Sequence, residues 1–82
     1  MTKQSTTMRA ELATRSSDGV EVTLLWAQTN GIDELVVCVS DIRAGAYFEI
    51  TADPDRALDV YYHPFAYRDF STLDYEDSRL AA

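Results

Sequence analysis

The chain has 82 residues, of which 46% are hydrophobic and 11% aromatic, so its composition indicates one folded domain and excludes a disordered chain. Its 14 acidic residues against 7 basic ones give a net charge of −7. This charge argues against a nucleic-acid partner, because phosphate contacts need clustered Lys and Arg. The apolar runs are too short for a signal peptide or a membrane span, and we therefore expect a cytoplasmic protein that does not bind membranes.

Two strands joined by a tight turn are expected first. Residues 1 to 7 are polar and predicted to be disordered, whereas Met8 to Arg15 alternates as an edge strand does. The alternation places Arg9 and Arg15 on the same side of this strand. Val20 to Gln28 alternates more clearly and is rich in residues that favour strands. The Asp-Gly pair between the two strands suits the positive φ angles of a hairpin turn.

Two more strands follow at short intervals. Asn30-Gly31 is a second hairpin signal and precedes Glu34 to Asp41, and a turn at DIRAG leads into Ala46 to Thr51. Four short strands joined by tight turns predict an antiparallel β-meander.

One helix is predicted after the strands. Asp53 is a candidate cap whose carboxylate could bond the first turn, Pro54 suits the first helical position, and Pro64 should end the helix near His63. The apolar residues at three- and four-residue spacing predict the buried face: Ala57, Leu58, Tyr61, Tyr62 and Phe65. We therefore expect an α+β fold (ββββα), with a single domain over residues 8 to 70, the C-terminal helix on one face of the sheet, and an acidic tail over 71 to 82.

The face of the sheet away from the helix is a candidate interface. If Val22, Leu24, Trp26, Val37 and Phe48 face the helix, a second apolar group forms on the opposite face: Leu25, Val36, Cys38 and Tyr47. An apolar patch ringed by polar residues marks a contact surface. The alternative is that the tail covers this patch through Phe70, Leu73 or Tyr75.

Few residues suggest chemistry. His63 is the single histidine and no nucleophile accompanies it, and Cys38 lacks the cationic surroundings that a reactive thiolate needs. We predict no catalytic residue, no metal site and no cofactor. A small-ligand pocket between helix and sheet would use Asp41, Arg43, Tyr62 and His63, although Asp41 could simply build a turn and His63 a helix end.

Two segments carry a resemblance to a known family. Asp41 to Thr51 (DIRAGAYFEIT) has the pattern D-x-R-x-G-x-x-F-E, and Ala57 to Tyr67 (ALDVYYHPFAY) has the pattern A-L-D-x-Y-x-H-P-[FY]-A-Y. With the VEVTLLW strand, the chain resembles a group of small uncharacterised actinobacterial proteins over residues 10 to 67. The resemblance implies a shared fold without a known activity, and it draws attention to the following residues: Asp41, Arg43, Gly45, His63 and Pro64.

The leading hypothesis from the sequence is a protein-protein interaction module. We expect a homodimer that pairs sheets either face to face or edge to edge, with the acidic tail free for an unknown protein partner. The alternative is a small-ligand-binding protein or minor enzyme with a pocket around His63.

Overall fold

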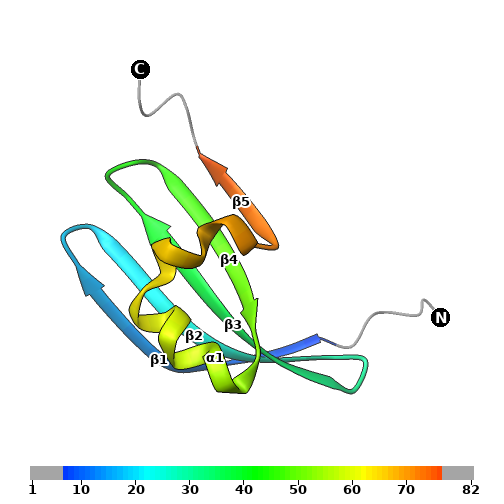
Figure 1. The fold of residues 1–82 in the computed structure, drawn as a ribbon. Helices are drawn as coiled ribbons and strands as arrows, with labels where there is room; N and C mark the ends of the chain where they lie inside the picture. The colour runs from blue at the N-terminus through cyan, green and yellow to red at the C-terminus, as the bar shows by residue number, and fades with distance from the viewer. Residues whose placement is uncertain (1–6, 77–82) are drawn as a thin grey trace.

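The structure is an α+β fold built on one antiparallel sheet, and the computed structural model describes residues 7–76 (Figure 1). The strands lie in chain order, β1-β2-β3-β4-β5. The α-helix α1 (Pro54–Tyr62) and a 3₁₀ helix, η1 (Pro64–Phe70), connect β4 to β5. The strands have these bounds: β1, Thr7–Ser17; β2, Val20–Thr29; β3, Ile32–Asp41; β4, Ala46–Ala52; and β5, Leu73–Glu76.

The first two turns have the geometry that their residues predict. Asp18 and Gly19 have φ angles of 55° and 83°, and Asn30 and Gly31 have 52° and 84°. Two successive positive φ angles define the turn that matches the twist of a two-residue hairpin, and Asp, Asn and Gly tolerate them at low cost. These turns set the register of β1 to β3.

The sheet has five strands, so the prediction of four was wrong. β5 pairs antiparallel with β4, with Tyr47 opposite Tyr75 and Glu49 opposite Leu73. Arg68 of η1 fastens this strand through two short bonds, Nε to Oδ2 of Asp74 at 2.7 Å and Nη2 to Oδ1 at 2.6 Å. The four residues of β5 (LDYE) alternate apolar and acidic side chains, but the run is too short to predict a strand by itself. Pairing with β4 and the bonds from Arg68 stabilise it.

The expected terminal segments fall partly outside the described residues. Residues 71 to 76, expected to be tail, include all of β5, and the carboxylates of Asp74 and Glu76 lie 2.6 and 3.7 Å from Nη2 of Arg68. Residues 1–6 and 77–82 lie outside the described part of the chain.

The helix α1 buries only part of the face that was predicted, together with Val60, which was not. Ala57, Val60 and Tyr61 are buried, whereas Leu58 and Tyr62 are 60% and 58% exposed. Positions i, i+3 and i+4 define one stripe of a helix, and a helix of two and a half turns on one face of a sheet buries little more than that stripe. The small side chains of Ala57 and Val60 allow the close approach that places Leu58 and Tyr62 outside.

The start of α1 also departs from expectation. Asp53 has extended backbone angles and precedes Pro54 as predicted, but its carboxylate makes no capping hydrogen bond. The backbone N–H of Arg56 donates to the carbonyl of Asp53 at 2.9 Å instead. The sequence therefore predicted the position of the helix start correctly. It assigned the capping bond to the Asp53 carboxylate, whereas the Asp53 carbonyl is the acceptor.

The main core lies between the sheet and the two helices. Phe48 is fully buried at its centre; the Phe65 ring meets it edge-on with centroids 5.5 Å apart, and the Arg68 guanidinium lies 4.8 Å from the Phe48 centroid. Aromatic and cation–π contacts of this kind add to the apolar burial. The buried members of this core are Val22, Leu24, Val37, Val39, Phe48, Ile50, Ala57, Val60 and Tyr61.

A register shift in β1 changes which side chains share a face. Glu11 pairs with Leu25 and Ala13 pairs with Leu24, so one residue of β1 is left over between them. The extra residue turns the rest of the strand over. Arg15 consequently lies opposite Val22 on the helix side, whereas Arg9 lies on the other face, and the expectation that they share a side was wrong.

Candidate functional site

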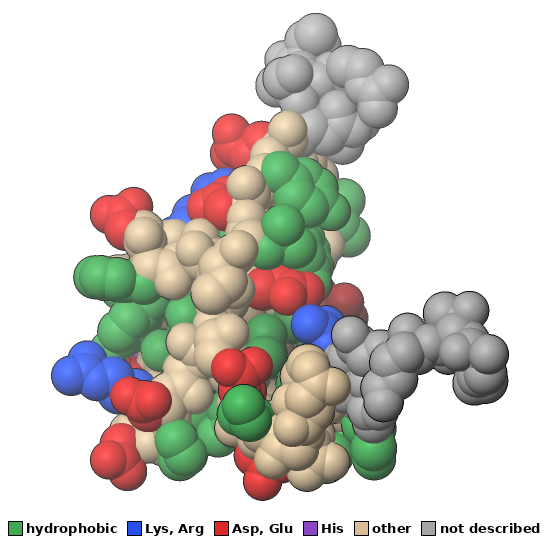
Figure 2. Space-filling view, turned by 90° about the vertical axis from the view of Figure 1, so that its right-hand side faces the viewer, with side chains coloured by type: hydrophobic (Ala, Val, Ile, Leu, Met, Phe, Trp, Pro, Cys, Tyr) green, Lys and Arg blue, Asp and Glu red, His purple; other side chains and the backbone are tan. Residues whose placement is uncertain are grey.

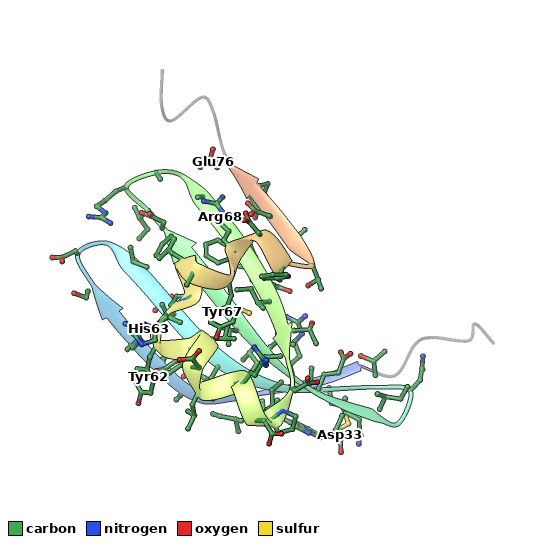
Figure 3. All side chains as sticks on the ribbon, in the orientation of Figure 1. Asp33, Tyr62, His63, Tyr67, Arg68 and Glu76 are labelled. Atoms are coloured by element: carbon green, nitrogen blue, oxygen red, sulfur yellow. The ribbon has the colours of Figure 1, made fainter. Side chains whose placement is uncertain are left out.

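An open depression of about 470 Å³ lies where the β1–β2 turn, the β3–β4 turn and the junction of α1 with η1 meet. Three of the four predicted ligand residues line it: Arg43, Tyr62 and His63. Figure 3 shows Tyr62 and His63 together at the end of α1, on the side of β1. The remaining lining residues are Arg15, Ser17, Asp18, Val20, Val22, Pro64, Phe65 and Ala66.

Arg15 is the residue of this depression that sequence reasoning missed. Its Nη2 donates to the carbonyls of Tyr61 at 2.7 Å and Tyr62 at 3.2 Å, and its guanidinium lies 5.3 and 5.8 Å from the centroids of their rings. A cation at the carbonyl end of a helix is favourable. The only local signal was an arginine near the end of an edge strand, and the bulge that turns it toward the helix has no signature in the sequence.

The expectation that His63 builds the helix end through its imidazole ring was wrong. Its backbone N–H donates to the carbonyl of Asp59 at 2.9 Å, and its side chain is exposed. Arg15 makes the bonds to the last carbonyls that the imidazole was expected to make. The His63 ring is therefore available at the rim of the depression.

Asp41 lies outside the depression and positions Arg43. It is buried in the β3–β4 turn, where Oδ1 accepts the backbone N–H groups of Arg43 at 3.1 Å and Ala44 at 3.3 Å. The same oxygen lies 3.6 Å from Nε of Arg43. A side-chain bond to the backbone two residues on stabilises a turn of this kind.

Gly19 gives the Arg43 side chain its place. A Cβ atom on Gly19 would lie 2.9 Å from Cγ of Arg43 and 3.2 Å from Cδ, so only glycine allows this approach. The backbone N–H of Ile42 also donates to the carbonyl of Gly19 at 2.9 Å. These contacts join the β1–β2 and β3–β4 turns, which lie at the same end of the sheet in Figure 1.

The four predicted interface residues lie together on the face opposite α1. The register pairs Leu25 with Val36, and the four residues form a second cluster together with Ala27. Val36 and Cys38 are only 4% and 9% exposed, however. Much of the expected patch is therefore already covered within one copy.

An ion pair between Arg9 of β1 and Glu49 of β4 crosses this face of the sheet. β1 and β4 are three strand spacings apart, about 14 Å in a flat sheet, yet Nη2 of Arg9 lies 3.5 Å from Oε1 of Glu49. The long side chains bridge much of this separation, and the sheet is also twisted, as the crossing of β1 with the other strands in Figure 1 indicates. The Arg9–Glu49 pair lies beside Cys38, which it influences electrostatically.

Burial suppresses the ionisation of Cys38 and Tyr47 on this face. Burial raises the pKa of the Cys38 thiol, and burial together with a hydrogen bond to Glu49 raises the pKa of Tyr47 far above its usual range. Both groups are therefore protonated at neutral pH, and a protonated thiol is a poor nucleophile and metal ligand. Within residues 7–76, no three His, Cys, Asp or Glu side chains cluster as a metal site would require.

β5 adds exposed apolar surface to this face. Leu73 and Tyr75 are 46% and 56% exposed, and the Tyr75 ring lies 5.7 Å from that of Tyr47. Figure 2 shows hydrophobic side chains gathered beside the end of the described chain, with acidic and basic side chains next to them. The expectation that Leu73 or Tyr75 could fold back against the patch is met in part, because Tyr75 contacts its rim.

Comparisons with known proteins add no assignment, since no family model, no curated protein and no solved structure matches the chain. The resemblance of residues 10 to 67 to small actinobacterial proteins thus stays a prediction. Neither helix in the described part of the chain is long and apolar enough to cross a membrane.

Proposed function

We propose that the protein is a small interaction module that forms a homodimer by pairing β1 of one copy with β1 of another. β1 is an edge strand of 11 residues with a neighbouring strand on one side only. A long free edge presents unpaired N–H and C=O groups to any strand that can align with it. The observation that carries the proposal is the charge pattern of β1, which is complementary to itself.

The direction of the backbone groups selects residues that can pair across this edge. Thr29 and Ile32 flank a two-residue turn and therefore bond each other through their backbones. The N–H and C=O groups of Thr29 thus point toward β3, and those of the alternate residues Gln28 and Trp26 point toward β1. Their partners Met8 and Ala10 bond back to β2. Arg9 and Glu11, which lie between and after them, accordingly present their N–H and C=O groups to the free edge.

An antiparallel register centred on Ala10 matches both the backbone and the charges. Arg9 of each copy then lies opposite Glu11 of the other, so two hydrogen-bonded pairs are also two ion pairs. Opposite charges facing each other across strands contribute about 0.2 to 1 kcal/mol per pair. Met8 and Leu12, which are 51% and 55% exposed, lie opposite each other in the same register.

The competing register centred on Ala13 fails. It would place Glu11 opposite Arg15, and the charges would again match. Arg15 pairs with Val22, however, and its N–H and C=O groups point toward β2 by the same alternation. The register centred on Ala10 is therefore the one we propose.

Face-to-face pairing through Leu25, Val36, Cys38 and Tyr47 is the second arrangement of the same function. Val36 and Cys38 have little exposed area left to bury, and Leu73 and Tyr75 would have to provide most of the contact. The paired strands also place Glu11, Glu21 and Glu34 on this face, where they would meet their counterparts. Like charges brought together oppose association.

The homodimer is tested by measuring solution mass over a concentration series by light scattering. A single strand edge buries less area than a standard interface, so we expect a weak dimer that forms at high protein concentration. Glu11→Arg places an arginine opposite Arg9 of the other copy, and the repulsion between them should give a monomer. Arg9→Glu faces Glu11 with a second glutamate and should also give a monomer.

Mixing these two variants provides the decisive comparison. Two copies of the same variant repel each other. One variant has arginine at both paired positions and the other has glutamate at both, so an equimolar mixture should form a heterodimer. Leu73→Glu is the control for face pairing and should leave the dimer intact. A wild-type monomer at every concentration would refute the proposal, and a dimer that Leu73→Glu dissociates would replace the edge with the face.

Small-ligand binding is the second candidate function, and the depression lined by Arg43, Tyr62 and His63 favours it. It predicts that His63→Ala changes function without changing the assembly state, whereas the homodimer proposal gives His63 no role.

A further inference from the structure

We infer that the depression between the two turns and the end of α1 binds a small organic anion, with its phosphate or carboxylate held by Arg15 and Arg43 and its apolar part against Tyr62 and Phe65. This inference does not depend on the proposed homodimer, because the N–H and C=O groups of Arg15 point toward β2 and its side chain lies on the helix side of the sheet. It rests on the charge, the free donors and the aromatic rim of the depression.

The charge of the depression is opposite to that of the whole protein. Acidic residues outnumber basic ones by 14 to 7 in the chain. The lining of the depression nevertheless holds two arginines, Arg15 and Arg43, against one acidic residue, Asp18. A concave site lined by one sign of charge focuses the field and attracts a ligand of the other sign.

Arg15 is held in place and still has hydrogens to donate. A guanidinium has five N–H donors. Two bonds from Nη2 go to the carbonyls of Tyr61 and Tyr62, whereas Nη1 has no acceptor among the described residues, and Nε is buried without one. The guanidinium also lies within cation–π distance of the Tyr61 and Tyr62 rings, which further restrains it. A fixed guanidinium with free donors is suited to a carboxylate or phosphate.

Arg43 supplies the second positive charge from the opposite turn. Its side chain is 63% exposed, and its ion pair with Asp41 is long at 3.6 Å. The close packing of its Cγ and Cδ on Gly19 sets the direction of the side chain. An anion between the turn and the helix end can therefore be shared by two guanidinium groups that come from distant parts of the chain.

The size and the rim of the depression indicate an organic anion. Its volume of about 470 Å³ lies within the range of small-molecule sites, roughly 300 to 1,000 Å³. Tyr62 and Phe65 line it and are 58% and 50% exposed, so their rings can cover an apolar group. Inorganic phosphate would leave these rings unused.

The experiment is an NMR titration of the full chain with phenyl phosphate, benzoate, inorganic phosphate and benzylamine, the last as a cationic control. We expect saturable shifts at Arg15, Arg43 and the ring of Tyr62 with phenyl phosphate or benzoate, weaker binding of inorganic phosphate, and none of benzylamine. Phenyl phosphate and benzoate separate a preference for phosphate from one for carboxylate.

Three variants sharpen the test. Arg43→Gln keeps Cγ and Cδ against Gly19 and should weaken binding at least fivefold, whereas Arg56→Gln removes an exposed arginine outside the depression and should change nothing. Asp18→Asn suits the same turn and removes the opposing charge, so it should strengthen binding about twofold to threefold. The inference is overturned by any of three results: no saturable shift up to ~10 mM probe, equal binding of benzylamine, or equal effects of Arg43→Gln and Arg56→Gln.

Discussion

Arg15 and Tyr61 are 46 residues apart in the chain, yet Nη2 of Arg15 donates to the carbonyl of Tyr61 at 2.7 Å. This contact connects the edge strand β1 to the end of α1, the helix that covers the main core. It also holds one wall of the depression. A single side chain thus serves both the stability of the fold and the geometry of the candidate site.

Replacing Arg15 should destabilise the fold. Arg15→Ala leaves the carbonyls of Tyr61 and Tyr62 without their donor and removes the cation–π contacts with both rings, which we expect to cost about 2 kcal/mol. Urea unfolding followed by circular dichroism measures this loss. Arg56→Ala, an exposed arginine on α1, is the control and should change stability by less than about 0.5 kcal/mol. Equal effects of the two variants would contradict the role of Arg15.

Gly19 and Gly31 form a matched pair that isolates the contact with Arg43. Both have φ near +84°, so alanine at either position costs about 1 to 2 kcal/mol in backbone strain. A Cβ on Gly31 meets nothing within 4 Å, whereas one on Gly19 lies 2.9 Å from Cγ of Arg43. We expect Gly19→Ala to be roughly 1 kcal/mol more destabilising.

The same pair provides its own check. In an Arg43→Ala background the Cγ and Cδ atoms are gone, and the two glycine substitutions should become equal in thermal or urea unfolding. A difference that persists in that background would show that something other than Arg43 requires glycine at position 19.

β5 should detach from the sheet in acid. The hydrogen bond with Arg68 lowers the pKa of Asp74 below its ordinary value of 3.8. A carboxylate with a lowered pKa stabilises the folded state above its ordinary pKa, and this contribution disappears as the pH falls through the folded-state value. The chemical shifts and amide exchange of Leu73–Glu76 should therefore report opening of β5 below about pH 4.

Asp74→Asn should open β5 at neutral pH and remove this pH dependence. Glu76→Gln is the control, because its carboxylate lies 3.7 Å from Arg68 and Asp74 provides the closer bonds. If β5 stays protected in Asp74→Asn, the strand is held by its pairing with β4 alone.

The buried stripe of α1 is tested by two neighbouring substitutions. Val60 is 2% exposed, and Val60→Ala should cost about 2 kcal/mol from the lost methyl groups and the space they leave. Leu58→Ala removes more atoms from a side chain that is 60% exposed and should cost less than about 0.5 kcal/mol. If Leu58→Ala were more destabilising than Val60→Ala in urea unfolding, Leu58 would belong to the buried face, as the sequence predicted.

Part of the candidate site could be anticipated from the sequence. Arg43, Tyr62 and His63 were expected to share a pocket, and all three line the depression. Asp41 was expected beside them but lies in the turn, because its short side chain bonds the backbone two and three residues on. Arg15 was not anticipated, since its position depends on a one-residue shift in β1 that no residue type signals.

The sequence by itself determined the features that a few neighbouring residues encode. Alternation predicted the first four strands, Asp-Gly and Asn-Gly predicted two turns, and the Pro54 and Pro64 positions delimited a helix, because these preferences arise from local backbone sterics. Together they predicted the α+β fold with an antiparallel sheet.

Only the tertiary structure decided the features that depend on distant partners. These are the stripe that α1 buries, the fifth strand, the bulge in β1 and the bonds from Arg15 to the end of α1. In each case the deciding free energy comes from packing or a hydrogen bond between segments far apart in the chain. Such contacts exist only once the sheet and helix have come together, and no local pattern encodes them.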